Sequence, residues 1–138
     1  NAALTVLDAT LRDGFCDSKG GCIAAGKRIA GTARTQAALG LDWRPHADWR
    51  VGADWRHVGA IAANDSNSVE APGYGVLGLS AGYTRQWGPW KLDVFARIDN
   101  LADKQYVGSV IVNESNGRYY EAAPGRQWMA GLSASYQF

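Results

Sequence analysis

Six side chains in the three long, turn-rich connections of this sequence could bind a charged ligand. A guanidinium group presents a planar fork of donors that matches carboxylates and similar oxygen anions, and a phenol donates or accepts a hydrogen bond. Together these groups suit an anionic, oxygen-rich ligand. The alternative is that each is an ordinary solvated loop residue. The candidates are Arg28, Arg34, Tyr74, Arg118, Tyr119 and Tyr120.

The cysteine pair points to a disulfide. Cys16 and Cys22 are the only cysteines of the chain and flank the turn-rich run Asp-Ser-Lys-Gly-Gly. An even pair within one loop suits an oxidising compartment, so we predict a disulfide, with two free thiols as the alternative. A zinc site needs more ligands than this loop offers, and no histidine lies nearby, so we predict no metal.

No catalytic constellation is evident, and we predict that the chain is not an enzyme. A nucleophilic serine needs a base beside it. Ser80, Ser133 and Ser135 lie on the polar faces of their predicted strands, but neither His46 nor His57 is placed to act on them. Both histidines are expected to be structural, and no cofactor is implied.

Composition excludes two classes of protein. A net charge of +1 gives no polycationic surface for nucleic acid. Apolar residues make up 46% of the chain, yet no run approaches the roughly 18 consecutive apolar residues of a spanning helix. The chain is sized for one domain, residues 1–138. It opens on alternating residues and not on a signal peptide, so we expect its natural N-terminus to lie upstream.

The elements that position these residues are predicted to be β-strands, and the last is the most regular. From Trp128 to Phe138 every second residue is apolar or aromatic, and the residues between are mostly polar or small. This length matches the roughly 9–11 residues with which a tilted strand crosses a bilayer. Similar alternation predicts six strands in all, at 3–12, 35–44, 49–56, 77–87, 90–99 and 128–138.

The connections alternate in length. Short turns are predicted at 45–48 and 88–89, and long connections at 13–34, 62–75 and 100–126. The third long connection contains a predicted hairpin, because Asn116-Gly117 is a strong turn signal between 107–113 and 118–122. Long loops at one end and short turns at the other are typical of an antiparallel transmembrane β-barrel with meander topology.

Aromatic residues favour a lipid-facing barrel over a soluble core. They lie beside the short turns or at the terminus, with the parity of the apolar faces, as an interfacial girdle requires. The girdle residues are Trp43, Trp49, Trp87, Trp90, Tyr136 and Phe138.

The opposite faces of the strands carry charges of both signs, which would then line a lumen and could pair across neighbouring strands. In the first strand the charged face is expected to hold Leu4 and Val6, opposite Ala3 and Leu7. The charged residues are Asp8, Arg12, Asp42, Arg44, Arg50, Asp54, Arg56, Lys91, Asp93, Arg97 and Asp99.

Three stretches together resemble the carboxyl end of a TonB-dependent outer-membrane receptor: residues 93–106, 117–126 and the Phe-terminated strand. Residues 26–45 resemble the entry to an earlier strand in siderophore-receptor members. Ala102 departs from the aromatic usual in the family, and Ala33 and Thr35 replace its usual Pro and His, which weakens a ligand subclass assignment. The motif residues are Asn100, Leu101, Asp103, Lys104, Tyr106, Pro124, Gly125 and Arg126.

The resemblance implies that the chain is the last six or so strands of a barrel of about 22 strands, with the plug domain and earlier strands absent. It implies import of a ferric siderophore or similar small chelate across the bacterial outer membrane, with energy from the TonB complex through the missing plug. The predicted ligand residues would then lie in extracellular loops, where lipopolysaccharide phosphates are alternative partners, and Arg126 is expected to face lipopolysaccharide.

Outer-membrane lipid and the barrel-assembly machinery, through the C-terminal strand, are the other implied partners. The competing hypothesis is a small self-contained soluble β-barrel or sandwich that binds a ligand or a protein partner. It requires the clustering of aromatic residues at one end of the strands to be accidental.

Overall fold

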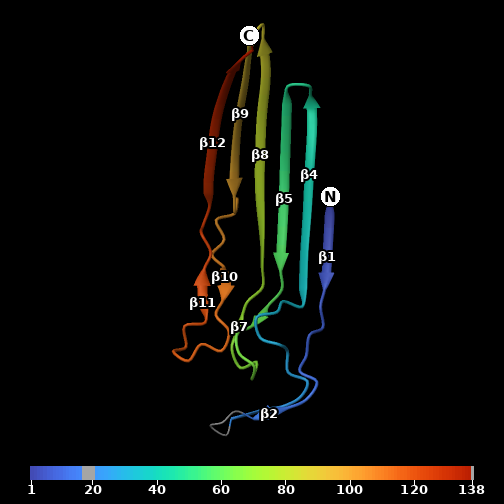
Figure 1. The fold of residues 1–138 in the computed structure, drawn as a ribbon, viewed down its shortest axis with the longest axis vertical. Helices are drawn as coiled ribbons and strands as arrows, with labels where there is room; N and C mark the ends of the chain where they lie inside the picture. The colour runs from blue at the N-terminus through green and yellow to red at the C-terminus, as the bar shows by residue number, and fades with distance from the viewer. Residues whose placement is uncertain (17–20, 138) are drawn as a thin grey trace.

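The protein is built around one antiparallel sheet of six strands. In the computed structural model, which describes residues 1–16 and 21–137, the strand order is β1-β4-β5-β8-β9-β12. Each strand pairs with the next long strand along the chain, so the topology is a meander (Figure 1). The all-β antiparallel prediction is confirmed.

Except for the first, the long strands match the predicted segments closely. Their bounds are β1 (Ala2–Val6), β4 (Thr35–His46), β5 (Trp49–Val58), β8 (Tyr74–Trp87), β9 (Trp90–Asp99) and β12 (Gln127–Tyr136). Two-residue turns, 47–48 and 88–89, connect β4 to β5 and β8 to β9. Gly88 supplies the positive φ of 55° that its turn requires. We call the end of the sheet that carries these turns the turn end.

The opposite end, the loop end, carries the long connections and three short two-stranded ladders (Figure 1). The predicted hairpin in the third connection is confirmed, although its strands are shorter than expected and a register shift follows Val107. The strands of these ladders are β2 (Phe15–Cys16), β3 (Cys22–Ile23), β6 (Ile61–Ala62), β7 (Glu70–Ala71), β10 (Val107–Val110) and β11 (Tyr120–Ala122).

Register assigns every long strand one apolar and one polar face. Directly paired residues point to the same side of a sheet, and Trp87 pairs with Trp90, which pairs with Tyr136. On the other side Ser80 pairs with Arg97, which pairs with Met129. We call these two sides the apolar face and the polar face.

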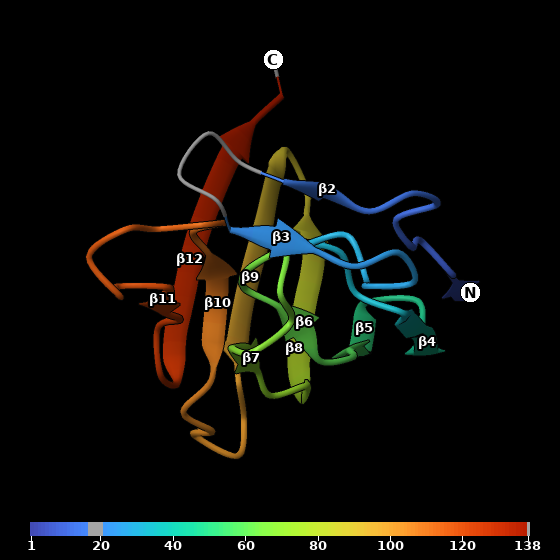
Figure 2. The ribbon, with the colours of Figure 1, turned by 90° about the horizontal axis from the view of Figure 1, so that it is seen from below.

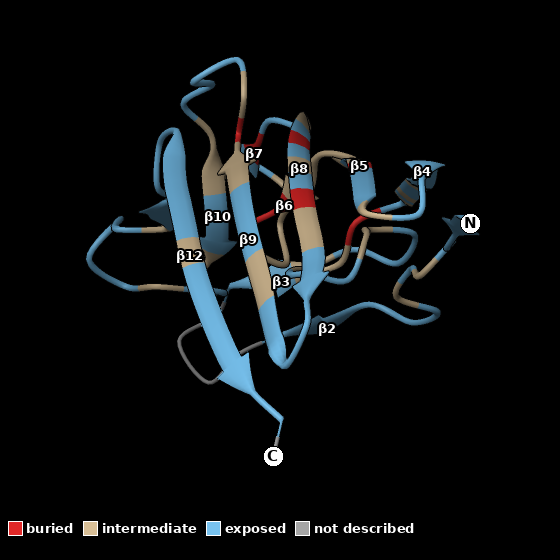
Figure 3. Cartoon of the chain, turned by 90° about the horizontal axis from the view of Figure 1, so that it is seen from above, coloured by how far each residue is buried: buried red, intermediate tan, exposed pale blue. Residues whose placement is uncertain are grey.

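Both faces are open, and the sheet is one layer. Seen along the strands, β4, β5, β8, β9 and β12 stand side by side (Figure 2). Leu132 and Trp128 on the apolar face are 71% and 72% exposed. Most of the sheet is exposed or intermediate in burial (Figure 3). Among the described residues the buried hydrophobic side chains are all alanines, and they lie at the loop end: Ala33, Ala62, Ala63 and Ala71.

The prediction for the first strand is wrong in length and in face. β1 ends at Val6, so Asp8 and Arg12 lie in the connection and not in the polar row. Leu4 pairs with Ala37, and therefore Leu4 and Val6 lie on the apolar face. Both faces of this stretch carry apolar residues, so alternation alone could not distinguish them.

The ends of other segments also differ. Pro45 and His46 belong to β4 and not to the turn, and the ladder shifts register between Trp43 and His46. The last strand ends at Tyr136, where the Gln137 amide donates to the Pro89 carbonyl. Phe138 lies outside the described residues. Within residues 1–16 and 21–137 we find no helix with the length and apolar character needed to span a membrane.

Candidate functional site

Ion pairs on the polar face cross a whole strand. Arg97 of β9 donates to Asp54 of β5 at 3.0 Å, and Arg50 of β5 donates to Asp93 of β9 at 2.8 Å. β8 lies between β5 and β9 in the sheet. The prediction of pairing between neighbouring strands is therefore wrong for these charges, which connect second neighbours.

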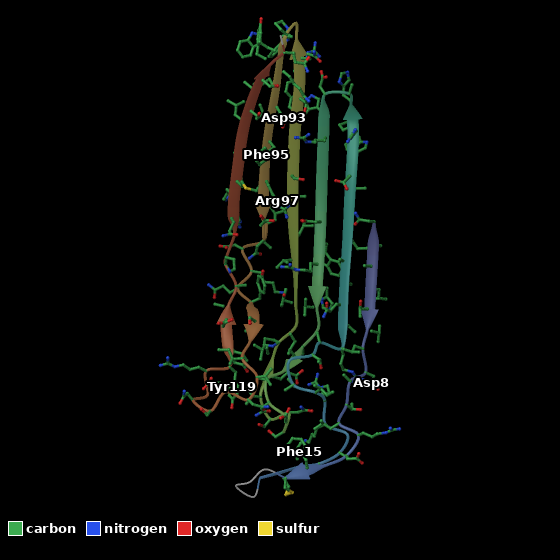
Figure 4. All side chains as sticks on the ribbon, viewed as in Figure 1. Asp8, Phe15, Asp93, Phe95, Arg97 and Tyr119 are labelled. Carbon is green, nitrogen blue, oxygen red and sulfur yellow. A yellow bond between two sulfur atoms is a disulfide. The ribbon has the colours of Figure 1, made fainter. Side chains whose placement is uncertain are left out.

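Glycines in β8 make room for this arrangement. A Cβ atom at Gly78 would collide with the carboxylate of Asp54, and one at Gly82 would collide with the side chain of Arg50. The charged side chains consequently lie flat across β8. On β12, a Cβ atom at Gly131 would likewise collide with the ring of Phe95. Figure 4 shows Asp93, Phe95 and Arg97 along β9.

The charges of the polar face are divided into two groups. Arg97 also donates to Asp99 at 2.8 Å, so β9 neutralises most of its charge within the sheet. Arg44 on β4 and Arg56 on β5 form no ion pair with any residue that the structure describes. Arg56 is exposed. Asp42, on the same face of β4, likewise forms no ion pair among the described residues and offsets Arg44, so the free positive charge that a ligand on this face would meet is that of Arg56 on β5.

Two of the three predicted arginine ligands at the loop end already have acidic partners. Arg28 forms a 2.9 Å ion pair with Glu70, and only 22% of its side chain is exposed. Arg34 lies 3.7 Å from Asp8, with both side chains well exposed. The geometry gives Arg28 a structural role and leaves Arg34 accessible.

The predicted tyrosines separate into two places. Tyr74 contacts Tyr106 in a tilted arrangement, with ring centroids 4.2 Å apart and an interplanar angle of 34°, where β8 enters the sheet. Tyr120 donates through its hydroxyl to the Glu70 carbonyl at 3.0 Å, and Tyr119 lies beside it with ring centroids 6.4 Å apart. Figure 4 places Tyr119 at the loop end. Arg118 is exposed.

A groove on the sheet brings Tyr106 near charged groups that sequence reasoning did not select as ligand contacts. The groove has a volume of about 570 Å³, and its lining includes Asp54, Arg56, Arg97, Asp99 and Tyr106. Arg56 pairs with Val76, two residues along the ladder from the pair Val58 and Tyr74, so Arg56 and Tyr74 lie on the same face. The sequence alternation already placed Arg56 on the polar face. That Arg56 lies near Tyr74 and Tyr106 depends on the strand register.

The motif residues that follow β9 form a locked turn. Asn100 has a φ of 52°, is 7% exposed, and its side chain binds the amide and the carbonyl of Lys104 at 2.9 and 2.8 Å. Asp103 has a φ of 53°, and its carboxylate accepts the Arg126 amide at 2.8 Å. Leu101 donates to the Leu77 carbonyl. These motif residues connect the start of β12 to the end of β9, a structural role. Pro124 and Gly125 line the groove described above.

Aromatic side chains lie in two rows on the apolar face. At the turn end the rings of Trp90 and Tyr136 are in contact, with centroids 5.1 Å apart. Trp43, Trp49 and Trp87 are between 48% and 61% exposed. Sequence reasoning missed the second row, Trp55 and Trp128, nearer the loop end. Trp128 pairs with Ile98, eight residues along β9 from Trp90, or about 26 Å at roughly 3.3 Å per residue.

Cys16 and Cys22 are joined by a disulfide that closes the β2–β3 hairpin, with an S–S distance of 2.03 Å.

The two histidines lie apart. His46 lies at the end of β4, and the ring of His57 stacks on Trp55 with centroids 5.8 Å apart. Within the described part of the chain no three His, Cys, Asp or Glu residues gather as metal ligands.

Comparison with known proteins agrees with this architecture. Residues 2–101 match the family model described as TonB dependent receptor-like, beta-barrel. The siderophore receptor PiuA from Acinetobacter baumannii matches 97% of this chain with a TM-score of 0.79 and 23% identity. BauA, the ferric preacinetobactin receptor of the same organism, matches 80% with a TM-score of 0.68 and 22% identity.

The unliganded ferric citrate transporter FecA also matches 80% of the chain, with a TM-score of 0.67 and 19% identity. The matched regions are 19% of PiuA, 16% of BauA and 18% of FecA, so this chain spans less than a fifth of these structures. The family model covers most of the sheet, and the solved structures share its fold. The chain belongs to the TonB-dependent receptor-like β-barrel family.

Proposed function

We propose that this chain forms part of the wall and outer mouth of a bacterial outer-membrane receptor that imports a ferric siderophore or a similar small chelate with TonB-derived energy. Family membership supports the transport class. The structurally similar proteins support the ligand class: PiuA is a siderophore receptor, BauA a ferric preacinetobactin receptor and FecA a ferric citrate transporter. The apolar face then contacts lipid, and the polar face lines the lumen.

One arrangement supports this ligand class: the tilted ring pair of Tyr74 and Tyr106, with Arg56 diagonally beside Tyr74 on the polar face. Phenols and an exposed guanidinium offer hydrogen-bond donors and one positive charge to an anionic, oxygen-rich chelate. Arg34, Arg118 and Tyr119 are further loop contacts in this proposal. Arg28 and Tyr120 support the loops, because their polar groups are already engaged.

The other partners follow from this placement. The TonB complex acts through a plug domain, the barrel-assembly machinery acts on the C-terminal strand, and lipopolysaccharide phosphate binds Arg126 at the outer interface. Trp128 lies two residues from Arg126 on the apolar face and is 72% exposed. An arginine next to an interfacial tryptophan suits a phosphate-rich lipid surface.

The test uses the full-length receptor and a panel of ferric chelates. Wild type is expected to bind at least one chelate and to support growth on it under iron limitation. Arg56→Gln should weaken that binding by about tenfold or more, since a charge-assisted hydrogen bond is lost. Lys91→Gln is the matched control, because Lys91 lies on the same face at the turn end. Failure of every ferric chelate to bind, or equal effects of the two variants, would contradict the proposal.

A further inference from the structure

The loop end is a single hydrogen-bonded body in which one loop joins two others. We call residues 61–73 the central loop. It lies between residues 26–34, which precede β4, and residues 107–122, which contain β10 and β11. Ala62 and Ala63 in the central loop have no exposed surface, so side chains larger than alanine would not fit at the points of contact.

Asn67 connects the central loop to residues 26–34. Its side-chain oxygen accepts the Arg28 amide at 2.7 Å, and its side-chain nitrogen donates to the Arg28 carbonyl at 2.9 Å. Glu70 adds the ion pair to the same arginine at 2.9 Å. The Gly31 amide donates to the Ala62 carbonyl at 2.8 Å. The central loop therefore binds both the backbone and the side chain of Arg28.

Asn113 connects the central loop to residues 107–122 in a similar way. Its side-chain oxygen accepts the Asp65 amide at 3.0 Å, and its side-chain nitrogen donates to the Asp65 carboxylate at 2.7 Å. The Asn113 amide donates to the Ala63 carbonyl at 2.9 Å. Tyr120 adds the 3.0 Å hydrogen bond to the Glu70 carbonyl.

Both asparagines have left-handed backbones, each with a φ of 55°. Asparagine tolerates this conformation better than other residues with a Cβ. In each case the side chain then makes two-point contact with a loop distant in sequence, 39 residues away for Asn67 and 48 for Asn113. The same residue type in the same conformation thus serves both junctions.

We propose that Asn67 and Asn113 are positioning residues: their carboxamides fix three outer loops into one rigid body, which holds the Tyr74–Tyr106 pair in place before ligand arrives. Tyr74 directly follows the central loop, and Tyr106 directly precedes β10. The central loop thereby sets the distance between the two phenols. A preorganised site avoids the ordering cost that mobile loops incur on binding. The role in ligand binding rests on the proposed function; the joining of the loops does not.

Hydrogen exchange on the ligand-free, full-length receptor tests the joining directly. Asn67→Gly and Asn113→Gly remove each carboxamide and retain the left-handed backbone. We expect Asn67→Gly to speed amide exchange roughly tenfold in residues 26–34 and measurably in 107–122. Asn113→Gly should do the reverse, with its larger effect in 107–122 and a smaller one in 26–34.

Ser68→Ala is the matched control, because among the described residues the Ser68 hydroxyl bonds only with Asn64 and Ser66 of the central loop. Its effect should stay within residues 61–73. Exchange in β8 and β9 should be unchanged in all three variants, which shows that the barrel is folded. Acceleration confined to the mutated loop in both asparagine variants would overturn the rigid-body proposal.

Binding of the ferric chelate that wild type recognises then separates the two proposals. Asn67→Gly should weaken binding about threefold to tenfold through lost preorganisation, and Ser68→Ala should not. If exchange is coupled but no receptor variant binds any chelate, the proposed function fails and the loop body stands. If wild type binds a chelate and Asn67→Gly binds it equally well without coupled exchange, the positioning role fails and the proposed function stands.

Discussion

Asp54 on β5 accepts a 3.0 Å hydrogen bond from Arg97 on β9, across the intervening strand β8. The carboxylate lies above Gly78, where any Cβ atom would displace it. Arg50 and Asp93 form the second such bridge at 2.8 Å, with Arg50 above Gly82. Two glycines in β8 therefore leave room for two ion pairs that couple β5 to β9.

The first prediction concerns this glycine-dependent coupling. A double-mutant cycle with Asp54→Asn and Arg97→Gln should give a coupling free energy of about 0.5–1 kcal/mol for this exposed pair. In a Gly78→Ala background the coupling should fall to near zero, because the new methyl group moves the carboxylate. Urea unfolding of the full-length receptor provides the measurement. In a Ser80→Ala background the coupling should persist, and its loss there would contradict the assignment to Gly78.

The second prediction concerns Asn100, which is buried and left-handed. Asn100→Ala loses two hydrogen bonds to Lys104 and places an ordinary residue at a φ of 52°. We expect the free energy of unfolding to fall by about 2–3 kcal/mol. Asn100→Gly retains the backbone conformation and should cost about 1 kcal/mol less. Equal costs for the two variants would show that backbone conformation has no part in the role of this residue.

The strands were predictable because their physics is local. Alternation in Trp90–Asp99 and Gln127–Tyr136 reports directly which side chains face which medium, and the two short turns fix the pairing of β4 with β5 and of β8 with β9. The prediction for the first strand was wrong, because Ala3, Leu4, Val6 and Leu7 are apolar on both faces and alternation shows no clear polar row. Pairing with β4 settles its face, and pairing is a long-range property.

The site was less predictable for the same reason. Arg28 was a sensible ligand candidate by residue type, yet Asn67 and Glu70, about 40 residues away, engage it. Tyr74 and Tyr106 meet only after two strands and a loop are placed. The bridges over Gly78 and Gly82 require the strand order as well as the charges. Residue type indicated the chemistry, and register decided which groups are free.

A third prediction concerns the disulfide. Cys16→Ser with Cys22→Ser removes the covalent closure of the β2–β3 hairpin. Hydrogen exchange in residues 11–16 and 21–27 should rise, because the closed loop loses a constraint that is worth about 2 kcal/mol in the chain-entropy account. The urea midpoint of the whole receptor should not change, since the hairpin lies beyond the sheet. A lowered midpoint would show that the hairpin supports the barrel.

A fourth prediction concerns the two aromatic rows. Trp90 and Trp128 are separated by roughly 26 Å along the strands, close to the roughly 25 Å height of an outer-membrane apolar band. Both side chains should therefore lie at lipid interfaces. In bilayers with brominated lipids, Trp90→Phe and Trp128→Phe should each remove fluorescence that shallow bromines quench more strongly than deep ones. Leu132→Trp, four residues from both Trp128 and Tyr136 on β12 and therefore midway between the rows, should add fluorescence with the opposite preference.

The central claim is that the apolar face contacts lipid and the polar face lines a water-filled lumen. Leu132 and Ser133 are adjacent on β12 and point to opposite faces, where Leu132 pairs with Val94 and Ser133 with Asp93. Spin labels at Leu132→Cys and Ser133→Cys in the full-length receptor in bilayers test the claim most directly. It predicts high oxygen accessibility at 132 and high accessibility to a water-soluble nickel chelate at 133. Nickel accessibility at both positions, or the reverse order, would contradict it.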